Sequence, residues 1–139
     1  MIKIDIACGS NPIEEFYGFD INESSKANII GTALKLPFKN SSIYIINNSH
    51  FLEHLIPSEA NIFIAEILRV LKKNGRLQMK IDKDLTKYIL LKKDKTHKYR
   101  YSKKEVVKLF NDFRKSRVVN KYYIFNLRLK NKIFVEAVK

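Results

Sequence analysis

The sequence predicts an α/β protein built on a mainly parallel sheet of about seven strands, with helices on both faces of the sheet. Three observations lead to this fold class. Short apolar stretches typical of strands recur along the chain, and two longer stretches repeat apolar residues at the three- and four-residue spacing of helices. The strands alternate with helices or short crossings until the last two, which follow one another directly and predict an antiparallel C-terminal hairpin.

Four strands are predicted before the first helix. The first, Ile2–Ala7, alternates β-branched residues and ends at the turn-forming cluster Cys8-Gly9-Ser10-Asn11-Pro12. Only residues 11–16 then precede the second strand, which is too few for a helix of three turns. The other three predicted strands are Tyr17–Ile21, Ala27–Ile30 and Ile43–Asn47.

Two helices are predicted in the second half of the chain. Ser58 is expected to cap a helix that runs to Leu71, with Asn74-Gly75 as its stop signal. Ser102 is expected to cap a second helix through Phe113, with Glu105 placed in its first turn, where a negative charge suits the helix dipole.

The remaining strands lie around the second helix. Arg76–Ile81 alternates as a strand directly after the first helix. Arg117–Phe125 and Lys132–Val138 are the final pair, with the hairpin turn expected around Leu127–Asn131.

The 139 residues are expected to form one domain, since a chain of this length supports a single core. The sequence has no apolar run long enough to span a membrane, and it starts without the features of a secretory leader. With Cys8 as its one cysteine, the chain can form no internal disulfide. A cytoplasmic location and no membrane partner are therefore expected.

Positive charge is concentrated in the second half of the chain. The net charge is +13, yet residues 1–71 hold 5 basic and 8 acidic side chains while residues 72–139 hold 22 and 6. Such a surface attracts anions, so a nucleic acid or another polyanion is one expected partner. A biased genome composition, rich in Lys, Ile and Asn, is the alternative explanation.

The first two predicted strands place two binding elements at the same edge of the sheet. The turn after the first strand contains Gly9, which allows a ligand to approach the backbone closely, and Asp20 ends the second strand. A carboxylate at that position can accept hydrogen bonds from ribose hydroxyls. A nicotinamide-dinucleotide site fits less well, because it requires Gly-x-Gly-x-x-Gly and an acid about 20 residues further on.

In the segments that contain Gly9 and Asp20, and in two further segments, the chain resembles the class I S-adenosylmethionine (SAM)-dependent methyltransferases, in particular small methyltransferase-11-like domains. The matching segments are Ile4–Pro12, Gly18–Ile21, Leu36–Ile43, and Ser49–Leu55 with Glu66–Leu77, and Ile133–Lys139 resembles the last strand of the family. The resemblance implies a Rossmann-like class I methyltransferase sandwich. It also implies SAM as cofactor and a methyl acceptor that the sequence does not identify, expected to be anionic.

The resemblance also implies roles for individual residues. Asp20 would hold the ribose, Ile21 would cover one face of the adenine, and His50 is the candidate catalytic base. The other expected SAM-binding residues are Ala7, Cys8, Gly9, Ser10, Thr32, Ala33, Leu34, Asn48 and Ser49. Weaker candidates for the acceptor site are His97, Tyr99 and Arg100, in the basic segment Lys92–Lys104.

Several departures from the family pattern keep a second hypothesis open. Ala7 stands for a usual glycine, Thr32 for a common aspartate and Tyr44 for a frequent acid, and the N-terminal helices that form a lid in many relatives are missing. The alternative is therefore a weak or inactive methyltransferase-like binding module or partner subunit, one that is RNA-associated or has its pocket closed by a partner chain.

No metal is predicted. His50-Phe51-Leu52-Glu53-His54 reads as His-x-x-Glu-His, a zinc pattern in another fold. It is also similar to the segment with which ubiquinone-pathway O-methyltransferases bind a divalent ion, although those enzymes have a glutamate in place of His50. We expect Glu53 and His54 to have structural roles instead.

Overall fold

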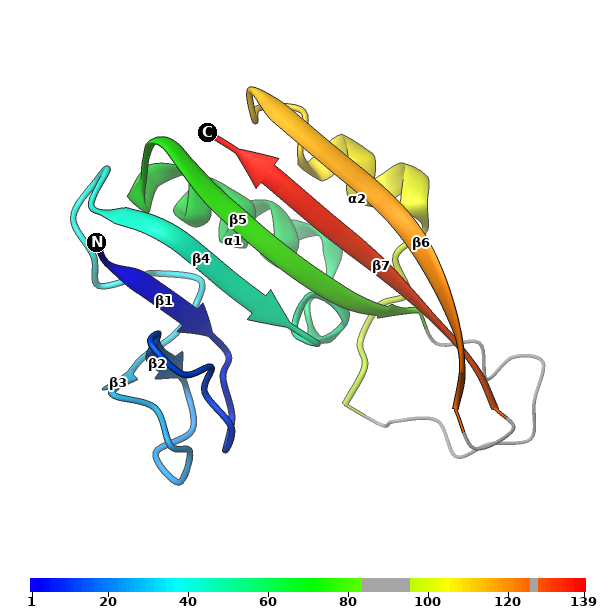
Figure 1. Ribbon diagram of the computed structural model, residues 1–139, viewed down its shortest axis with the longest axis horizontal. Coiled ribbons are helices and arrows are strands. Elements are labelled where there is room, and N and C mark those ends of the chain that lie inside the picture. Colours follow the sequence, from blue (N-terminus) through cyan, green and yellow to red (C-terminus); the bar gives the residue numbers. More distant parts are fainter. Residues whose placement is uncertain (84–95, 126–127) are drawn as a thin grey trace.

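A single seven-stranded sheet forms the centre of the protein (Figure 1). The computed structural model describes residues 1–83, 96–125 and 128–139. The strand order is β3-β2-β1-β4-β5-β7-β6. The strands are β1 (Lys3–Ile6), β2 (Tyr17–Asp20), β3 (Ile29–Ile30), β4 (Ile43–Ser49), β5 (Leu71–Lys83), β6 (Lys115–Phe125) and β7 (Arg128–Val138).

The directions of the strands confirm the predicted sheet. Every neighbouring pair from β3 to β5 is parallel, and β7 runs antiparallel to both β5 and β6. The hairpin turn is shorter than predicted. The pairing of β6 with β7 continues to Phe125 opposite Arg128, so Arg128–Asn131 belongs to a strand, while Leu127 lies outside the described residues.

In the described residues, three helical segments connect the strands: the 3₁₀ turn η1 (Leu52–His54), α1 (Pro57–Val70) and α2 (Lys103–Leu109). Ser102 caps α2 as predicted, because its hydroxyl accepts from the Glu105 N–H and the Glu105 carboxylate accepts from the Ser102 N–H. The predicted cap at Ser58 is wrong. Pro57 already occupies the first helical position, and Glu59 accepts from the Ile56 N–H instead.

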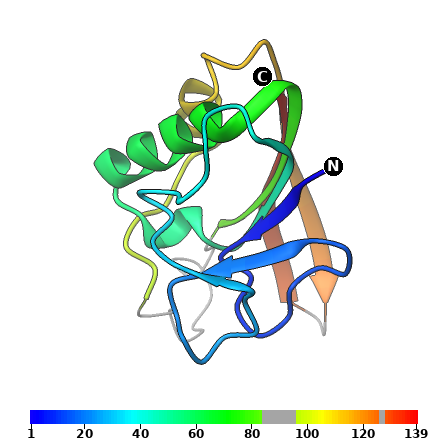
Figure 2. The same ribbon diagram turned by 90° about the vertical axis from the view of Figure 1, so that its left-hand side faces the viewer.

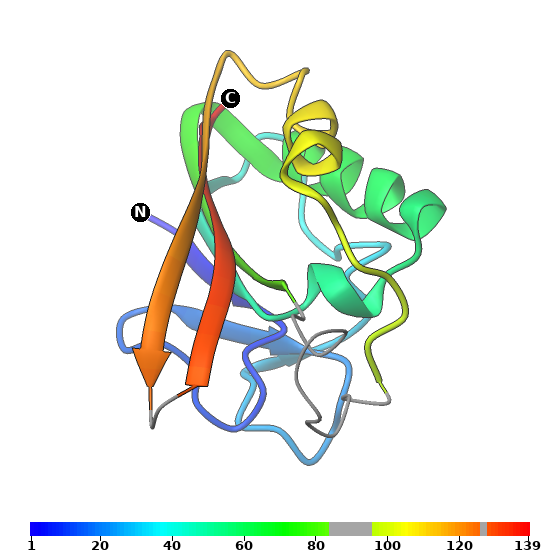
Figure 3. The same ribbon diagram turned by 90° about the vertical axis from the view of Figure 1, so that its right-hand side faces the viewer.

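Both α1 and α2 cover the same face of the sheet (Figures 2 and 3). The prediction of helices on both faces is therefore wrong for residues 1–83, 96–125 and 128–139. The reason lies in the short link between β1 and β2, where residues 7–16 form turns instead of a helix. None of the described helices is long and apolar enough to cross a membrane.

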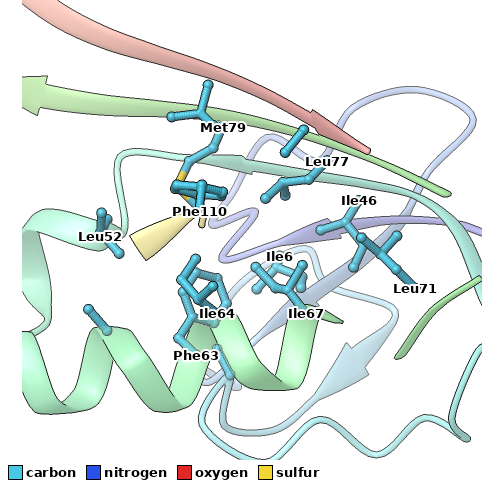
Figure 4. Packing of buried hydrophobic residues seen from close by; sticks show 14 of the residues in the cluster. Ile6, Ile46, Leu52, Phe63, Ile64, Ile67, Leu71, Leu77, Met79 and Phe110 are labelled. Carbon is cyan, nitrogen blue, oxygen red and sulfur yellow. The ribbon is translucent and has the colours of Figure 1, made fainter. Parts of the chain in front are cut away.

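The core lies between the helices and the sheet face that they cover (Figure 4). Phe63 and Ile67 of α1 point toward Ile6 and Ile46 of the sheet, and Phe110, at the end of α2, lies beside Met79. All six side chains are at most 3% exposed. Burial of large apolar side chains from β1, β4, β5 and both helices holds these strands against the helices. It thereby fixes the positions of the carboxyl ends of the strands.

Candidate functional site

The loop after β1 bends sharply toward the end of β2. Ala7 and Gly9 have φ angles of 57° and 58°, in the left-handed region. The Ala7 N–H donates to the Phe19 carbonyl at 2.7 Å, and the Gly9 N–H donates to Oδ2 of Asp20 at 2.8 Å. The glycine turn and the carboxylate that the sequence singled out are therefore in direct contact.

A second glycine lets this loop pack against β2. A Cβ built at Gly18 would lie 2.8 Å from the Cys8 sulfur and 3.1 Å from Cβ of Pro12, so no other residue fits without moving the loop. Gly9 meets no such obstacle, because the space beside it is open for 4 Å, and it is its φ angle that favours glycine. The missing side chain of Gly18 lets the loop pack closely against β2, and the positive φ angle of Gly9 sets the direction in which the loop turns.

The carboxylate of Asp20 retains acceptor capacity. Its Oδ2 accepts from Gly9, and its Oδ1 accepts from the Asn22 N–H at 2.9 Å. An ionised carboxylate has about four lone-pair sites, so about two remain for hydroxyl groups of a ligand. The side chain next to it, Ile21, is apolar yet 71% exposed. A ligand that has hydroxyl groups and an apolar ring would contact Asp20 through its hydroxyls and Ile21 through its ring.

A cavity of about 530 Å³ opens at the carboxyl ends of β1, β2 and β4. Seven of the residues singled out from the sequence line it: Ala7, Asp20, Ile21, Thr32, Ala33, Leu34 and His50. Its other lining residues, none of which was predicted to bind the cofactor, are Phe19, Gly31, Phe51, His54, Leu55, Glu59, Thr96 and Lys98. The cavity is thus assembled from loops that are far apart in the sequence.

The segment that carries Thr32–Leu34 is clamped by α1. The Arg69 guanidinium donates to the carbonyls of Leu36 and Phe38 at 2.8 and 2.7 Å and pairs with the Glu66 carboxylate. Glu66 in turn accepts from the Leu36 N–H at 2.7 Å. Because charge-assisted, bidentate contacts are geometrically specific, this pair fixes one wall of the cavity.

The remaining expected cofactor residues do not line this cavity. The side chain of Asn48 is fully buried and donates to the Ile6 carbonyl at 2.9 Å, which ties β4 to β1. Ser49 points to the opposite face of the sheet, where it lines a separate groove. Successive residues of a strand face opposite ways, so Asn48 and Ser49 could not both reach one ligand.

Cys8, Gly9 and Ser10 form the turn beside the cavity but do not line it. Burial, followed by the negative charges of Asp5 and Asp20, raises the pKa of the Cys8 thiol. A thiol kept protonated is a poor nucleophile, so the geometry gives Cys8 a packing role against Gly18.

His50 lies at the centre of a polar network. Its Nδ1 is 3.1 Å from Oδ2 of Asp82 and 3.6 Å from Oε1 of Glu53, and its Nε2 is 3.1 Å from Nζ of Lys132. Lys132 also lies 3.4 Å from Oδ1 of Asp82. Asp82 and Lys132 face each other across β5 and β7, and this register brings both to the histidine.

This network shifts two pKa values in opposite directions. The close approach of Asp82, and then that of Glu53, raises the pKa of His50, against the opposing effects of burial and of Lys132. Burial favours a higher pKa for Asp82, but the contacts with His50 and Lys132 outweigh it and lower the pKa to about 2. The neighbouring ammonium group favours the neutral ring and the carboxylates favour the charged one, and the carboxylates prevail.

Glu53, for which the sequence predicts a structural role, has a buried carboxylate. It is 1% exposed, and its Oε1 accepts from the Asp82 N–H at 3.2 Å, while its Oε2 has no hydrogen-bond partner among the described residues. Two groups of side chains with potential ligand atoms within 4.8 Å of one another share it, one with His50 and Asp82 and one with His54 and His97. That no metal binds here stays a prediction.

The weaker acceptor-site candidates lie beside the cavity. His97 packs edge-on against the His54 ring at 4.9 Å, and the Tyr99 hydroxyl donates to Glu105 at 2.6 Å. Arg100 is exposed, and none of the three lines the cavity. Lys98, which lies between them, lines it and pairs with Glu59 at 3.3 Å. Residues 92–95 of the basic segment lie outside the described residues.

Comparisons with known proteins agree with this fold. Residues 4–79, more than half of the chain, match the family described as methyltransferase domain. No curated protein matches the sequence.

Solved structures share the fold at low sequence identity. A SAM-dependent methyltransferase from Methanosarcina mazei is 21% identical with a TM-score of 0.76, and the match covers 99% of this chain and 91% of that one. For a SAM-dependent methyltransferase from Archaeoglobus fulgidus the values are 17%, 0.81, 99% and 85%. For phosphoethanolamine N-methyltransferase 2 of Haemonchus contortus, solved with S-adenosyl-L-methionine, they are 13%, 0.74, 100% and 48%.

Proposed function

Because the chain belongs to the class I methyltransferase family, whose methyl donor is SAM, we propose that it transfers a methyl group from SAM to an anionic acceptor. The observation that carries the proposal is the contact of 2.8 Å between the Gly9 N–H and Asp20 at the edge of the cavity. It joins the backbone turn and the carboxylate into one binding element for a nucleoside.

The residues of the cavity fit this cofactor. The free lone pairs of Asp20 suit the two ribose hydroxyls, and exposed Ile21 suits one face of the adenine. Ala33 and Leu34 would border the adenine edge, and beside them the Thr32 hydroxyl oxygen accepts from the Leu34 N–H at 3.3 Å. Ala7, which also lines the cavity, would hold the methionine end. When bound, SAM supplies a methyl group on a positively charged sulfur, which makes that methyl electrophilic.

The residues of this chain contribute positioning and proton transfer. Much of the rate of a methyl transfer comes from holding the acceptor in line with the methyl group. His50 is the proposed base for the acceptor proton, and its raised pKa requires deprotonation first. Activity is therefore expected to rise with pH above about 6.5, the ordinary pKa of histidine.

An anionic acceptor is supported by two cationic side chains. Lys98 lines the cavity, and Lys132 lies 3.1 Å from Nε2 of His50. Ammonium groups at these positions attract an anion and help to orient it. Acidic groups, Glu59 and Asp82, balance both lysines in the free protein, so an acceptor would compete for existing ion pairs.

Calorimetry with SAM tests the proposal. Replacing Asp20→Ala removes charge-assisted hydrogen bonds to the ribose, each worth about 1.5–3 kcal/mol, so Kd is expected to rise by at least about tenfold. Asp112→Ala is the matched control, because Asp112 is exposed in the turn after α2. If the wild-type protein does not bind SAM, the proposal fails. If it binds SAM but transfers no methyl group to any acceptor, the binding-module hypothesis is preferred.

A further inference from the structure

The face of the sheet opposite α1 and α2 carries a basic groove that methyl transfer does not use. Side chains alternate along β5, so Leu77 and Met79 pack beneath the helices while Arg76, Gln78 and Lys80 point the other way. No helix among residues 1–83, 96–125 and 128–139 covers that second face, as the two side views show (Figures 2 and 3).

Two adjoining hollows form this groove, which we name the open-face groove. Their volumes are about 270 and 370 Å³, and they share the lining residues Gln78, Arg117 and Glu136. Because they share these residues, the hollows lie next to each other along the middle of β5, β7 and β6. Ser49, expected from the sequence to bind the cofactor, lies at the end of this groove.

Basic side chains flank the open-face groove on both sides. β5 contributes Arg76 and Lys80 on one side, and β6 contributes Lys115, Arg117 and Lys121 on the other. Since β7 lies between these strands, and neighbouring strands are about 4.8 Å apart, the two basic rows are separated by roughly 10 Å. Within the described part of the chain, Glu136 is the one acidic residue that lines the groove.

The floor of the groove is formed by an aromatic ring and two polar side chains, whereas its edges are basic. The ring of Phe134 lies there, and the ammonium groups of Lys121 and Lys80 stand 4.8 and 6.0 Å from its centroid. These cation–π contacts hold both lysines over the groove. Beside the ring, Gln78 offers an amide and Glu136 a carboxylate, groups that hydrogen-bond base edges.

We propose that the open-face groove binds a single-stranded nucleic acid, with its phosphates on the two basic rows and its bases over Phe134, Gln78 and Glu136. Basic edges around an aromatic floor are how many proteins hold single strands. A single strand fits this floor better than a duplex, because only unpaired and unstacked bases expose their faces to an aromatic ring and their pairing edges to an amide and a carboxylate. An acidic protein segment would match the rows but would leave the amide and the carboxylate of the floor without a role.

Fluorescence anisotropy with a labelled oligouridylate of about 15 nucleotides tests this site, using the full chain. We expect binding that weakens with salt, because the slope of log K against log salt is about −0.7 for each phosphate neutralised on a single strand. The double variant Arg117→Gln/Lys121→Gln is expected to bind at least tenfold more weakly. It should also flatten the slope by about 1.4.

The control is Lys103→Gln/Lys104→Gln, which removes the same charge from the start of α2, outside the groove. It should bind the oligouridylate nearly as well as the wild-type protein. Equal losses in both double variants would mean that net charge alone acts, and would overturn the proposal. No binding at about 50 mM salt would overturn it as well.

Unlabelled polyglutamate serves as a competitor in the same assay. If it displaces the oligouridylate as efficiently as unlabelled oligouridylate does, the groove is an acidic-protein site and the proposal fails. Neither Arg117 nor Lys121 lines the cofactor cavity, so SAM binding by the double variant should match the wild type. This readout separates a failure of the groove from a failure of the proposed methyltransferase function.

Discussion

At the scale of single residues, the protonation of His50 is controlled by residues that are distant in sequence. Asp82 contributes most to its raised pKa, and Lys132 opposes the rise. A group whose pKa is higher in the folded state stabilises the fold when it is protonated. The stabilisation is complete below the unfolded pKa of about 6.5 and is lost as the pH rises through the folded pKa.

His50→Gln is therefore expected to lower the free energy of unfolding more at about pH 5.5 than at about pH 8.5. Glutamine cannot carry the positive charge that pairs with Asp82, whose own pKa of about 2 keeps it ionised at both values. Urea unfolding at the two pH values measures the difference. In an Asp82→Asn background the same replacement should show less pH dependence, and an equal loss at both pH values in the wild-type background would contradict the assignment.

At the scale of elements, the two helices begin in different ways. α2 starts with a reciprocal pair of hydrogen bonds between Ser102 and Glu105, whereas α1 starts with Pro57 and the carboxylate of Glu59. Both solutions satisfy N–H groups that the first helical turn leaves unpaired. Only the first depends on a serine hydroxyl.

Ser102→Ala is expected to cost about 1 kcal/mol of stability, because the Glu105 N–H loses its acceptor. Ser58→Ala is the matched control. Ser58 lies inside the first turn of α1 rather than at its cap, so the expected change is within about 0.5 kcal/mol. Chemical denaturation of both variants measures the two values. A loss at Ser58 as large as that at Ser102 would mean that Ser58 caps α1 after all.

At the scale of the whole molecule, one core connects the sheet to both helices. Buried residues of β1, β4, β5, α1, α2 and β7 belong to a single cluster. The sequence predicts one domain for residues 1–139, and because the core is shared we expect the chain to unfold as a unit. Phe110 is a sensitive position, since it is fully buried and its ring lies 5.3 Å from that of Phe113.

Phe110→Ala is expected to lower the free energy of unfolding by about 3–5 kcal/mol. Val107→Ala, on the exposed side of α2, should change it by less than about 0.5 kcal/mol. Urea unfolding followed by circular dichroism and by tyrosine fluorescence measures both values. The two probes should give coincident transitions. Separate transitions in the wild-type protein would contradict the single domain.

The family and the sheet could be predicted because their signals are local. Gly9 follows one recognisable strand and Asp20 ends the next, and parallel strands bring their carboxyl ends to one edge. Thr32–Leu34 and His50 follow later strands, and together with Asp20 they line the cofactor cavity, while Gly9 lies in the turn beside it. Periodicity also located both helices, although α1 begins one residue before the predicted cap and α2 ends at Leu109, before Phe113.

The partners of His50 could not be predicted, because they depend on strand register. Asp82 and Lys132 are 50 residues apart and meet only because β5 pairs antiparallel with β7 at that position. The face of the sheet toward which the Ser49 side chain points could not be predicted either, because a shift of one residue in strand register turns every side chain of that strand to the opposite face.

Local signals in the sequence are enough to predict the class I fold, the family and the placement of a glycine turn and Asp20 at the same edge of the sheet. These follow from local strand, turn and motif signals that need no knowledge of distant contacts. Three features could be seen only in the folded molecule: the side chains that surround His50, the position of α1 and α2 on one face, and the groove on the opposite face that gathers basic residues of β5 and β6. Those features arise from the register and order of strands that are remote along the chain.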